Sequence, residues 1–255
     1  MKIENRIITD IKDYKEIPNI QRSAWGFSEL DIEPHQLITR IQKYGGLVTG
    51  FFIDGKMIGF SFAFLAKEGE KLFLYSHMAA VIKEYQGKGF GFLIKKYQRE
   101  ETLKMGYNII KWTYDPLESL NSYFNIHRLG AISNEYEENI YGIGESGLHK
   151  GLPTDRMVAC WILDSDRVKN RMGNKYPPEI VDPNKIDFDF NERFSYIEIP
   201  KDIREIKMKD MEEALSWRLK TRELFERSFK KGYMIDDIVF SKDKKRVFYR
   251  LVKEG

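Results

Sequence analysis

A short segment with three glycines is the first place where the sequence could support chemistry. Residues 77–95 read HMAAVIKEYQGKGFGFLIK, with Gly87, Gly89 and Gly91 at alternate positions between an apolar run and a helical pattern. Glycine lets backbone N–H groups converge where a side chain would block them, and the start of a helix adds unpaired donors and the positive end of its dipole. Together these features predict a cradle for an anion such as a phosphate group.

Three classes of phosphate-bearing ligand use such a cradle, and residue spacing separates them. A P-loop needs GxxxxGK followed by Ser or Thr, which this loop does not supply. A dinucleotide-binding loop needs GxGxxG and a tight turn, but Phe92 stands at the third glycine position and Ile82–Gln86 separate the apolar strand from Gly87. Asp115 favours a dinucleotide, because it ends the following strand at about the distance of the acid that binds ribose.

The third class, the acyl-CoA ligands, is indicated by a family resemblance. Gln86-Gly87-Lys88-Gly89-Phe90-Gly91 matches the pattern QxxGxG, and a strand ending at Val81 and a helix from Phe90 flank it. Over residues 1–165 the chain resembles the GNAT (GCN5-related N-acetyltransferase) superfamily, in a bacterial branch with an extra C-terminal segment. The resemblance implies that acetyl-CoA or another acyl-CoA binds through its pantetheine and pyrophosphate. The cofactor-binding residues it implies are Ala79, Ala80, Val81, Gln86, Gly87, Lys88, Gly89, Phe90, Gly91 and Asn121.

Two titratable residues are candidates for the proton transfers that acyl transfer requires. An acceptor amine needs a base for its ammonium proton, and the leaving thiolate needs an acid. His77 lies four residues before Val81, on the strand that carries the thioester in family members, and histidine titrates in the useful range. The alternative for His77 is a packed or capping side chain. Asp115 closes the next strand, in WTYDP, and could act in catalysis or cap the helix that follows.

Other candidate positions match the family less closely. GNAT enzymes often carry a tyrosine acid four residues before the glycine that ends the later helix, but Ile126 stands there, so Tyr123 or a water is expected to substitute. Arg156, in Asp155-Arg156, could grip a substrate carboxylate or form an ordinary ion pair. Trp112 is expected in the core or in the wall of the acceptor pocket.

Alternating strands and helices must position these residues. The patterns predict strands at 2–9, 47–54, 56–66, 71–82, 108–114, 131–142 and 156–163, and helices at 13–26, 33–45, 90–106 and 119–130. Asp54-Gly55 predicts a tight hairpin turn between the second and third strands. The expected fold is α/β (α+β), a GNAT-like mixed, mainly antiparallel sheet flanked by helices.

The composition of the sequence changes after about residue 166. Pro177, Pro178 and Pro183 interrupt a polar stretch, and a strand, a helix and a strand pair follow. We expect residues 1–167 to form the acyl-CoA-binding domain, 168–190 a linker or irregular connection, and 191–255 a strand-helix-hairpin half-domain. The order of elements in this half-domain weakly repeats that of residues 107–164.

Composition excludes several classes of protein. The chain has 255 residues, 42% hydrophobic and 32% charged, with a net charge of +3, which predicts a globular protein and no nucleic-acid partner. Its N-terminus lacks a signal peptide's apolar stretch and no run reaches the roughly 18 apolar residues of a membrane span, so a cytoplasmic location is expected. The histidines lack metal-like spacing, and Cys160 is expected to be a buried small hydrophobe.

The sequence therefore predicts a CoA-dependent N-acyltransferase that uses acetyl-CoA first and succinyl-CoA second. The expected acceptor is a small-molecule amine, with amino acids among the candidates, and a homodimer is one expected assembly. The alternative is a catalytically silent acyl-CoA sensor or regulatory module, which the missing tyrosine favours slightly.

Overall fold

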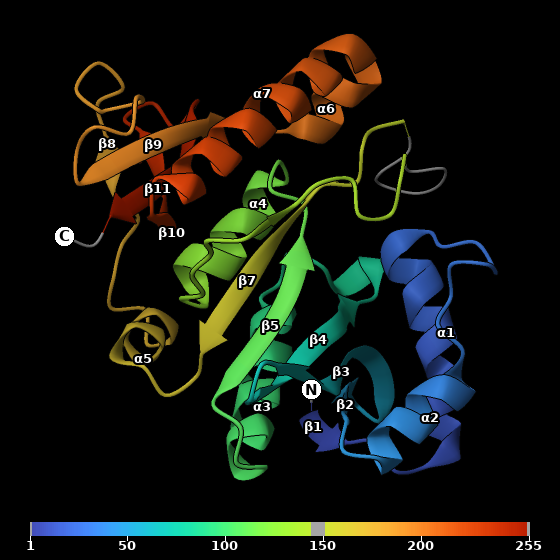
Figure 1. Cartoon of the computed structure of the whole chain (residues 1–255). Coiled ribbons are helices and arrows are strands. Elements are labelled where there is room, and N and C mark those ends of the chain that lie inside the picture. Colours follow the sequence, from blue (N-terminus) through green and yellow to red (C-terminus); the bar gives the residue numbers. More distant parts are fainter. Residues whose placement is uncertain (1, 144–150, 254–255) are drawn as a thin grey trace. The chain divides into compact units, whose positions relative to one another are not determined.

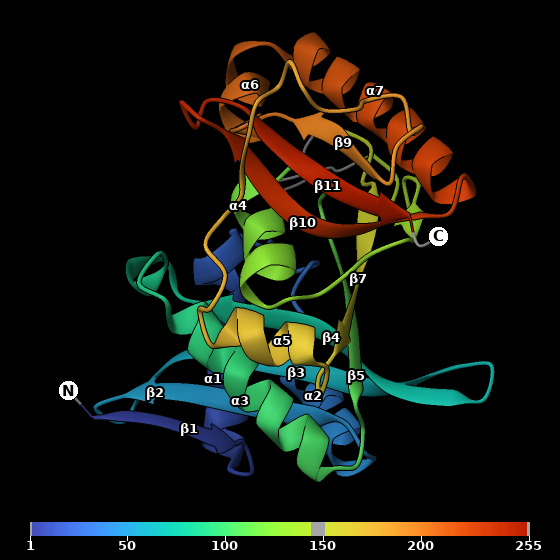
Figure 2. The ribbon, with the colours of Figure 1, turned by 90° about the vertical axis from the view of Figure 1, so that its left-hand side faces the viewer.

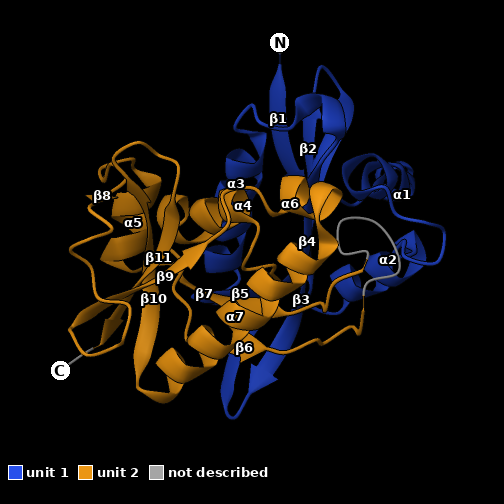
Figure 3. Ribbon diagram, turned by 90° about the horizontal axis from the view of Figure 1, so that it is seen from above, with its two compact units in different colours: residues 1–112 blue, residues 113–255 orange. Residues whose placement is uncertain are grey.

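The computed structural model describes residues 2–143 and 151–253 and divides into two compact units. The first unit comprises residues 1–112 and the second residues 113–255 (Figure 3). No helix in the described ranges is both long and apolar enough to cross a membrane.

The first unit is built on a mainly antiparallel sheet (Figure 1). Its strands are β1 (Ile3–Ile7), β2 (Leu47–Ile53), β3 (Lys56–Glu68), β4 (Lys71–Val81) and β5 (Ile109–Tyr114), the last of which runs into the second unit. Strands β1 to β4 pair antiparallel in chain order, and β5 pairs parallel with β4. Asp54 and Gly55, at φ of 48° and 81°, form the predicted turn between β2 and β3, since both central residues of this turn type need positive φ.

Helices cover both faces of this sheet. Helices α1 (Ile11–Trp25) and α2 (His35–Lys43) share one buried cluster with Phe52 and Phe60, whereas Ile94 of α3 (Phe90–Lys104) shares another with Phe51 and Ile53. Because successive strand residues point to opposite faces, the two clusters lie on opposite sides of β2. The first unit is therefore a three-layer arrangement of helix, sheet and helix.

The second unit contains a four-stranded sheet in the order β8 (Ile180–Val181), β10 (Tyr233–Ser241), β11 (Val247–Lys253) and β9 (Phe194–Ile199). Helix α7 (Met211–Lys230) packs against β9 and β10, and Figure 2 shows it above the β10-β11 hairpin. A short helix, α4 (Ser119–Ser122), continues into a π-helix (Tyr123–Arg128), and β6 (Tyr136–Glu137) pairs antiparallel with β7 (Arg156–Ile162). The remaining elements are α5 (Asp166–Met172) and α6 (Ile203–Lys209).

The expected fold class, a mixed sheet flanked by helices, is confirmed, and three local expectations are corrected. Residues 166–172 form α5, because Ser165 accepts a hydrogen bond from the N–H of Val168 and so begins a helix. The strand predicted at 131–142 shrinks to β6, because Asn139 takes a φ of 46° and donates its N–H to the Asp155 carboxylate. Cys160 is partly exposed rather than buried. The predicted domain boundary after residue 167 falls within the second unit and stays a prediction.

Candidate functional site

The glycine loop connects β4 to α3. Gly87 and Gly89 have φ of 74° and 84°, in the left-handed region that favours glycine. A Cβ at either position would meet no atom within 4 Å, so both residues are open towards solvent. Gly89 begins α3 without a side-chain cap, and Gly91 lies in the first turn of the helix. The loop therefore exposes main-chain donors at the positive end of the α3 dipole, as an anion site requires.

Neighbouring side chains hold the ends of this loop. Gln86 donates from Nε2 to the main-chain oxygen of Val81 at 2.9 Å. The Phe90 ring lies 5.3 Å from that of Phe51 and 5.9 Å from that of Tyr85, measured between centroids. Between these anchors the exposed Lys88 places its Nζ 5.1 Å from the Tyr85 ring and adds a positive charge to the loop.

Strand β4 carries a β-bulge at His77. Phe62 pairs with Met78 and Ala63 with Ser76, so that His77 is the extra residue. Pairing between β4 and β5 covers Leu74 and Tyr75, and no such pairing is found for residues 77–81 in the part of the chain that the structure describes. Ala79 is exposed, whereas Ala80 and Val81 are buried. Beyond the bulge, the side of β4 away from β3 is thus available for main-chain contacts with an extended ligand.

His77 forms a pair with Glu33, a residue that the sequence did not single out. His77 Nε2 lies 3.1 Å from Glu33 Oε1, and both side chains are about 30% exposed, at 32% and 29%. The fully buried Gln21 holds the main chain of Glu33 in place. Its side chain accepts a hydrogen bond from the Glu33 N–H at 2.9 Å and donates one to the Glu33 carbonyl at 3.0 Å. The two residues are 44 positions apart in the sequence, so no local sequence pattern predicts the pair.

Helix α3 carries a buried lysine, Lys95, next to Ser76 of β4. Lys95 Nζ donates to Ser76 Oγ and Gln98 Oε1, both at 3.0 Å, and lies 4.0 Å from the Trp112 ring centroid. Burial lowers the pKa of the Lys95 amine to about 7. Trp112 is 6% exposed and makes the contacts of a core residue, so its place in an acceptor pocket stays a prediction.

Asp115 makes structural contacts within the second unit. Its Oδ1 accepts from the N–H of Leu117 at 2.9 Å, and its Oδ2 from Arg218 Nη2 at 2.6 Å. Both side chains are buried, so removal of either one would take this partner from a buried charge. Asp115 therefore stabilises the turn that precedes α4, whose N-cap position is Glu118, rather than capping the helix itself, and its role in catalysis stays a prediction.

Tyr123 begins the π-helix of the second unit and stacks on His127. Their ring centroids lie 4.7 Å apart, and His127 Nδ1 lies 2.8 Å from Asp237 Oδ1. Burial raises the pKa of the Tyr123 phenol, so the group is protonated at neutral pH, as an acid must be. Asn121 is exposed and accepts from Asn125 at 3.4 Å.

Asp155, the neighbour of Arg156, pairs with Arg222. Asp155 accepts two hydrogen bonds from Arg222, both at 2.8 Å, and one from the Tyr136 hydroxyl at 2.6 Å. The Arg156 guanidinium lies 5.5 Å from the Tyr141 ring centroid. Asp155 thus has Arg222 as an ion-pair partner, and a substrate-binding role for Arg156 stays a prediction.

Comparison with known proteins identifies the fold. No family model and no curated protein matches the chain. Similar solved structures include the ribosomal-protein-S18-alanine N-acetyltransferase of Escherichia coli, with a TM-score of 0.52 and 14% identity over 64% of this chain and 96% of that one. Another is yncA of Salmonella typhimurium with its cofactor acetyl-CoA, with a TM-score of 0.52 and 15% identity over 65% of this chain and 96% of that one. A third is an acetyltransferase of the GNAT family from Streptococcus pneumoniae, with a TM-score of 0.50 and 15% identity over 62% and 98%. The chain therefore has the GNAT fold, and about a third of its length extends beyond these matches.

Proposed function

We propose that this protein is a CoA-dependent N-acyltransferase that moves an acetyl or succinyl group to a small-molecule amine, with amino acids among the candidate acceptors. The observation that carries the proposal is the end of the β4–β5 pairing at Tyr75, next to the bulge at His77 and before a glycine loop at a helix N-terminus. The GNAT fold supports it, because yncA shares this fold and was solved with acetyl-CoA.

The residues of the first unit support a specific way of holding the donor. The pyrophosphate would lie over Gly87, Gly89 and Gly91, where main-chain donors and the helix dipole favour negative charge. The extended pantetheine would follow residues 77–81, whose open edge offers main-chain groups at strand spacing. The thioester would then lie near the bulge, which is where β4 carries its titratable side chain.

His77 is the proposed base for the acceptor. The hydrogen bond between its Nε2 and Glu33 leaves Nδ1 as the nitrogen that takes the ammonium proton, directly or through a water. The free amine nitrogen then attacks the thioester carbonyl, the C–N bond forms, and the C–S bond breaks. The departing thiolate takes a proton from an acid, for which Tyr123 or a water is the candidate.

One observation favours the second candidate, an acyl-CoA sensor without turnover. Ile126 stands where family members often carry the tyrosine acid, and it is fully buried. A chain with the cradle but no acid would bind acyl-CoA and release it unchanged.

A thiol-release assay separates the two functions. The full-length protein would be offered acetyl-CoA and succinyl-CoA with a panel of free amino acids and diamines, and cofactor binding would be measured by calorimetry. Thiol release that depends on both substrates is the expected result. Binding without turnover across the panel would favour the sensor, and NAD binding without CoA binding would contradict both functions.

A further inference from the structure

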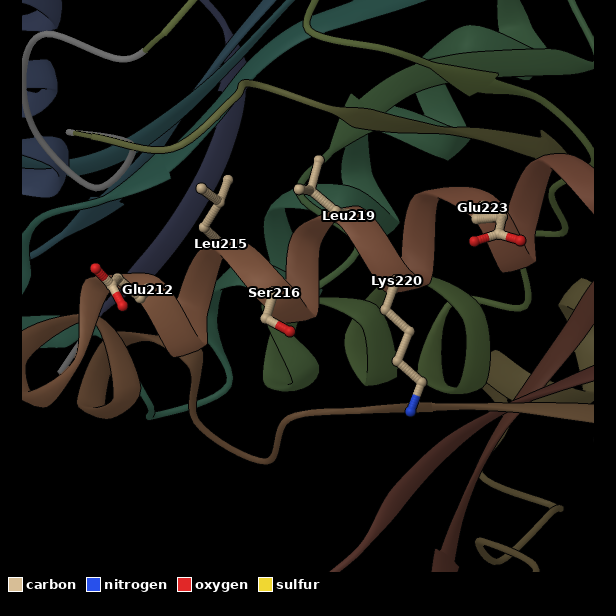
Figure 4. A pocket seen from close by; sticks show the side chains of 6 residues that line it. All are labelled: Glu212, Leu215, Ser216, Leu219, Lys220 and Glu223. Atoms are coloured by element: carbon tan, nitrogen blue, oxygen red, sulfur yellow. The ribbon is translucent and has the colours of Figure 1, made fainter.

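The outer face of α7 combines apolar and charged side chains in an unusual way. The inner face of the helix is buried and consists of Ala214, Arg218, Thr221, Phe225 and Ser228. The opposite face carries Leu215 and Leu219, which are 37% and 47% exposed. Figure 4 shows the open hollow on this face, lined by Glu212, Leu215, Ser216, Leu219, Lys220 and Glu223.

This face places two partly exposed leucines among charged and polar side chains. A helix packed on a sheet normally turns charged and polar residues outward, and contiguous exposed apolar side chains mark interaction sites. Leu215 and Leu219 are one helical turn apart, so their side chains are neighbours. Met211, the first residue of α7, is 42% exposed, and Met208 of α6 is 81% exposed.

We infer that this face pairs with the same face of a second copy of the chain, with the two α7 helices antiparallel about a two-fold axis at Ser216. Such an axis places a residue that precedes Ser216 opposite the residue that follows it by the same number of positions. Glu212 precedes Ser216 by four positions and Lys220 follows it by four. Opposite charges therefore meet twice, once on each side of the axis.

The charges also exclude the neighbouring arrangements. Parallel pairing would place Glu212 against Glu212 and Lys220 against Lys220 of the second copy. An antiparallel axis between Trp217 and Arg218 would place Glu212 against Glu223. Like charges opposite one another disfavour both arrangements. The small Ser216 at the crossing lets the helices approach closely, and the same rule places Leu219 of each copy opposite Glu213 of the other.

The size of the face sets the strength of the dimer. Helix α7 has 20 residues, and one face of a single helix falls short of the roughly 800 Å² per partner of a standard interface. The expected dimer is therefore weak, with a dissociation constant on the order of 10–100 µM.

Sedimentation velocity of the full-length protein over about 1–300 µM tests the inference. The wild type should pass from monomer to dimer, and Leu219→Glu should stay monomeric. Glu212→Lys or Lys220→Glu alone places like charges opposite each other twice and should weaken dimerisation about tenfold, whereas the double exchange Glu212→Lys/Lys220→Glu should restore it. Glu16→Lys, the same charge change at an exposed position of α1, should leave dimerisation unchanged.

Thermal melting of each variant separates lost pairing from lost folding. Two results would overturn the inference: a wild type that is monomeric at every concentration, or a dimer that survives both Leu219→Glu and Glu212→Lys. A double exchange that folds but does not recover dimerisation would overturn the Ser216 axis.

Discussion

At the scale of single residues, the pair of His77 and Glu33 is the most direct test of the chemistry. His77→Ala should lower turnover by about a hundredfold, because the acceptor loses its base, while CoA affinity stays unchanged. Glu33→Gln keeps the shape of the side chain but removes its charge, and it should lower turnover about tenfold. The double variant should be no slower than His77→Ala alone, since residues that act as a unit are not additive.

His35→Ala is the matched control for this experiment, since His35 is a partly exposed histidine at the start of α2. It should turn over like the wild type. Near-normal turnover of His77→Ala would remove His77 from the mechanism and direct attention to Asp115.

Lys95 predicts a pH dependence of stability. Its amine has an ordinary pKa of 10.5 in the unfolded chain and a pKa of about 7 in the folded one. Between these values the unfolded state binds more protons, so the free energy of unfolding rises with pH by up to about 1.4 kcal/mol per pH unit. Below pH 7 both states are protonated and the group contributes no slope.

Urea denaturation between pH 7 and 9 measures this dependence. Lys95→Met should flatten the rise in stability relative to the wild type, because the titrating group is gone. Lys96→Met, at the exposed neighbouring position of α3, should keep the wild-type slope. Equal slopes for all three proteins would show that the amine is not desolvated.

Site residues that belong to a local sequence pattern could be predicted from the sequence, and those brought in by tertiary contacts could not. The glycine loop and the strand position of His77 are local patterns, so they could be assigned without tertiary information. Glu33 and Arg222 could not, because they reach His77 and Asp155 over 44 and 67 positions. The bulge that re-aims His77 is a property of the register between β3 and β4, which the β4 sequence alone does not specify.

At the scale of elements, α3 offers a matched pair of glycines. Gly89 precedes the helix and Gly106 follows it, at φ of 84° and 85°, and a Cβ at either would meet no atom within 4 Å. Alanine at either position should therefore cost a similar amount of stability, about 1–2 kcal/mol, from left-handed backbone strain alone.

Only one of these substitutions should affect the cofactor. Gly89→Ala places a methyl group where the pyrophosphate would approach, and it should weaken CoA binding at least tenfold by calorimetry. Gly106→Ala is equally strained but lies at the far end of α3, so it should bind CoA like the wild type. Equal CoA affinities for the two folded variants would refute the cradle.

Short elements were the hardest part of the fold to predict. The hairpin at Asp54-Gly55 and the long periodic α3 follow from local patterns that carry strong conformational preferences. Helix α5 has seven residues in a polar stretch rich in proline, where its one clear signal is the Ser165 cap. The strand expected at 131–142 ends after β6, because Asp155 and Thr154 bind the main chain of Asn139 and Tyr141.

At the scale of the whole molecule, the C-terminal segment shares buried interactions with residues that precede position 168. Within the second unit, Arg218 pairs with Asp115, the Tyr249 hydroxyl lies 2.6 Å from Ser122 Oγ, and Ser133 exchanges main-chain hydrogen bonds with Ile235. The segment from 168 to 255 therefore completes the packing of residues that come before it in the chain. Because a truncated protein would lose these contacts, they predict that it would be less stable than the whole chain.

A chain of residues 1–167 should fail to fold cooperatively. The cut leaves the buried Asp115 without Arg218, and breaking such a pair costs about 3–5 kcal/mol, a large part of the 5–15 kcal/mol that stabilises a typical domain. Circular dichroism melting would compare the truncated chain with the full one. Co-expression with residues 168–255 should restore a cooperative transition, because it returns the missing partners. A truncated chain that melts like the full-length protein and binds CoA with equal affinity would instead establish residues 1–167 as an independent domain.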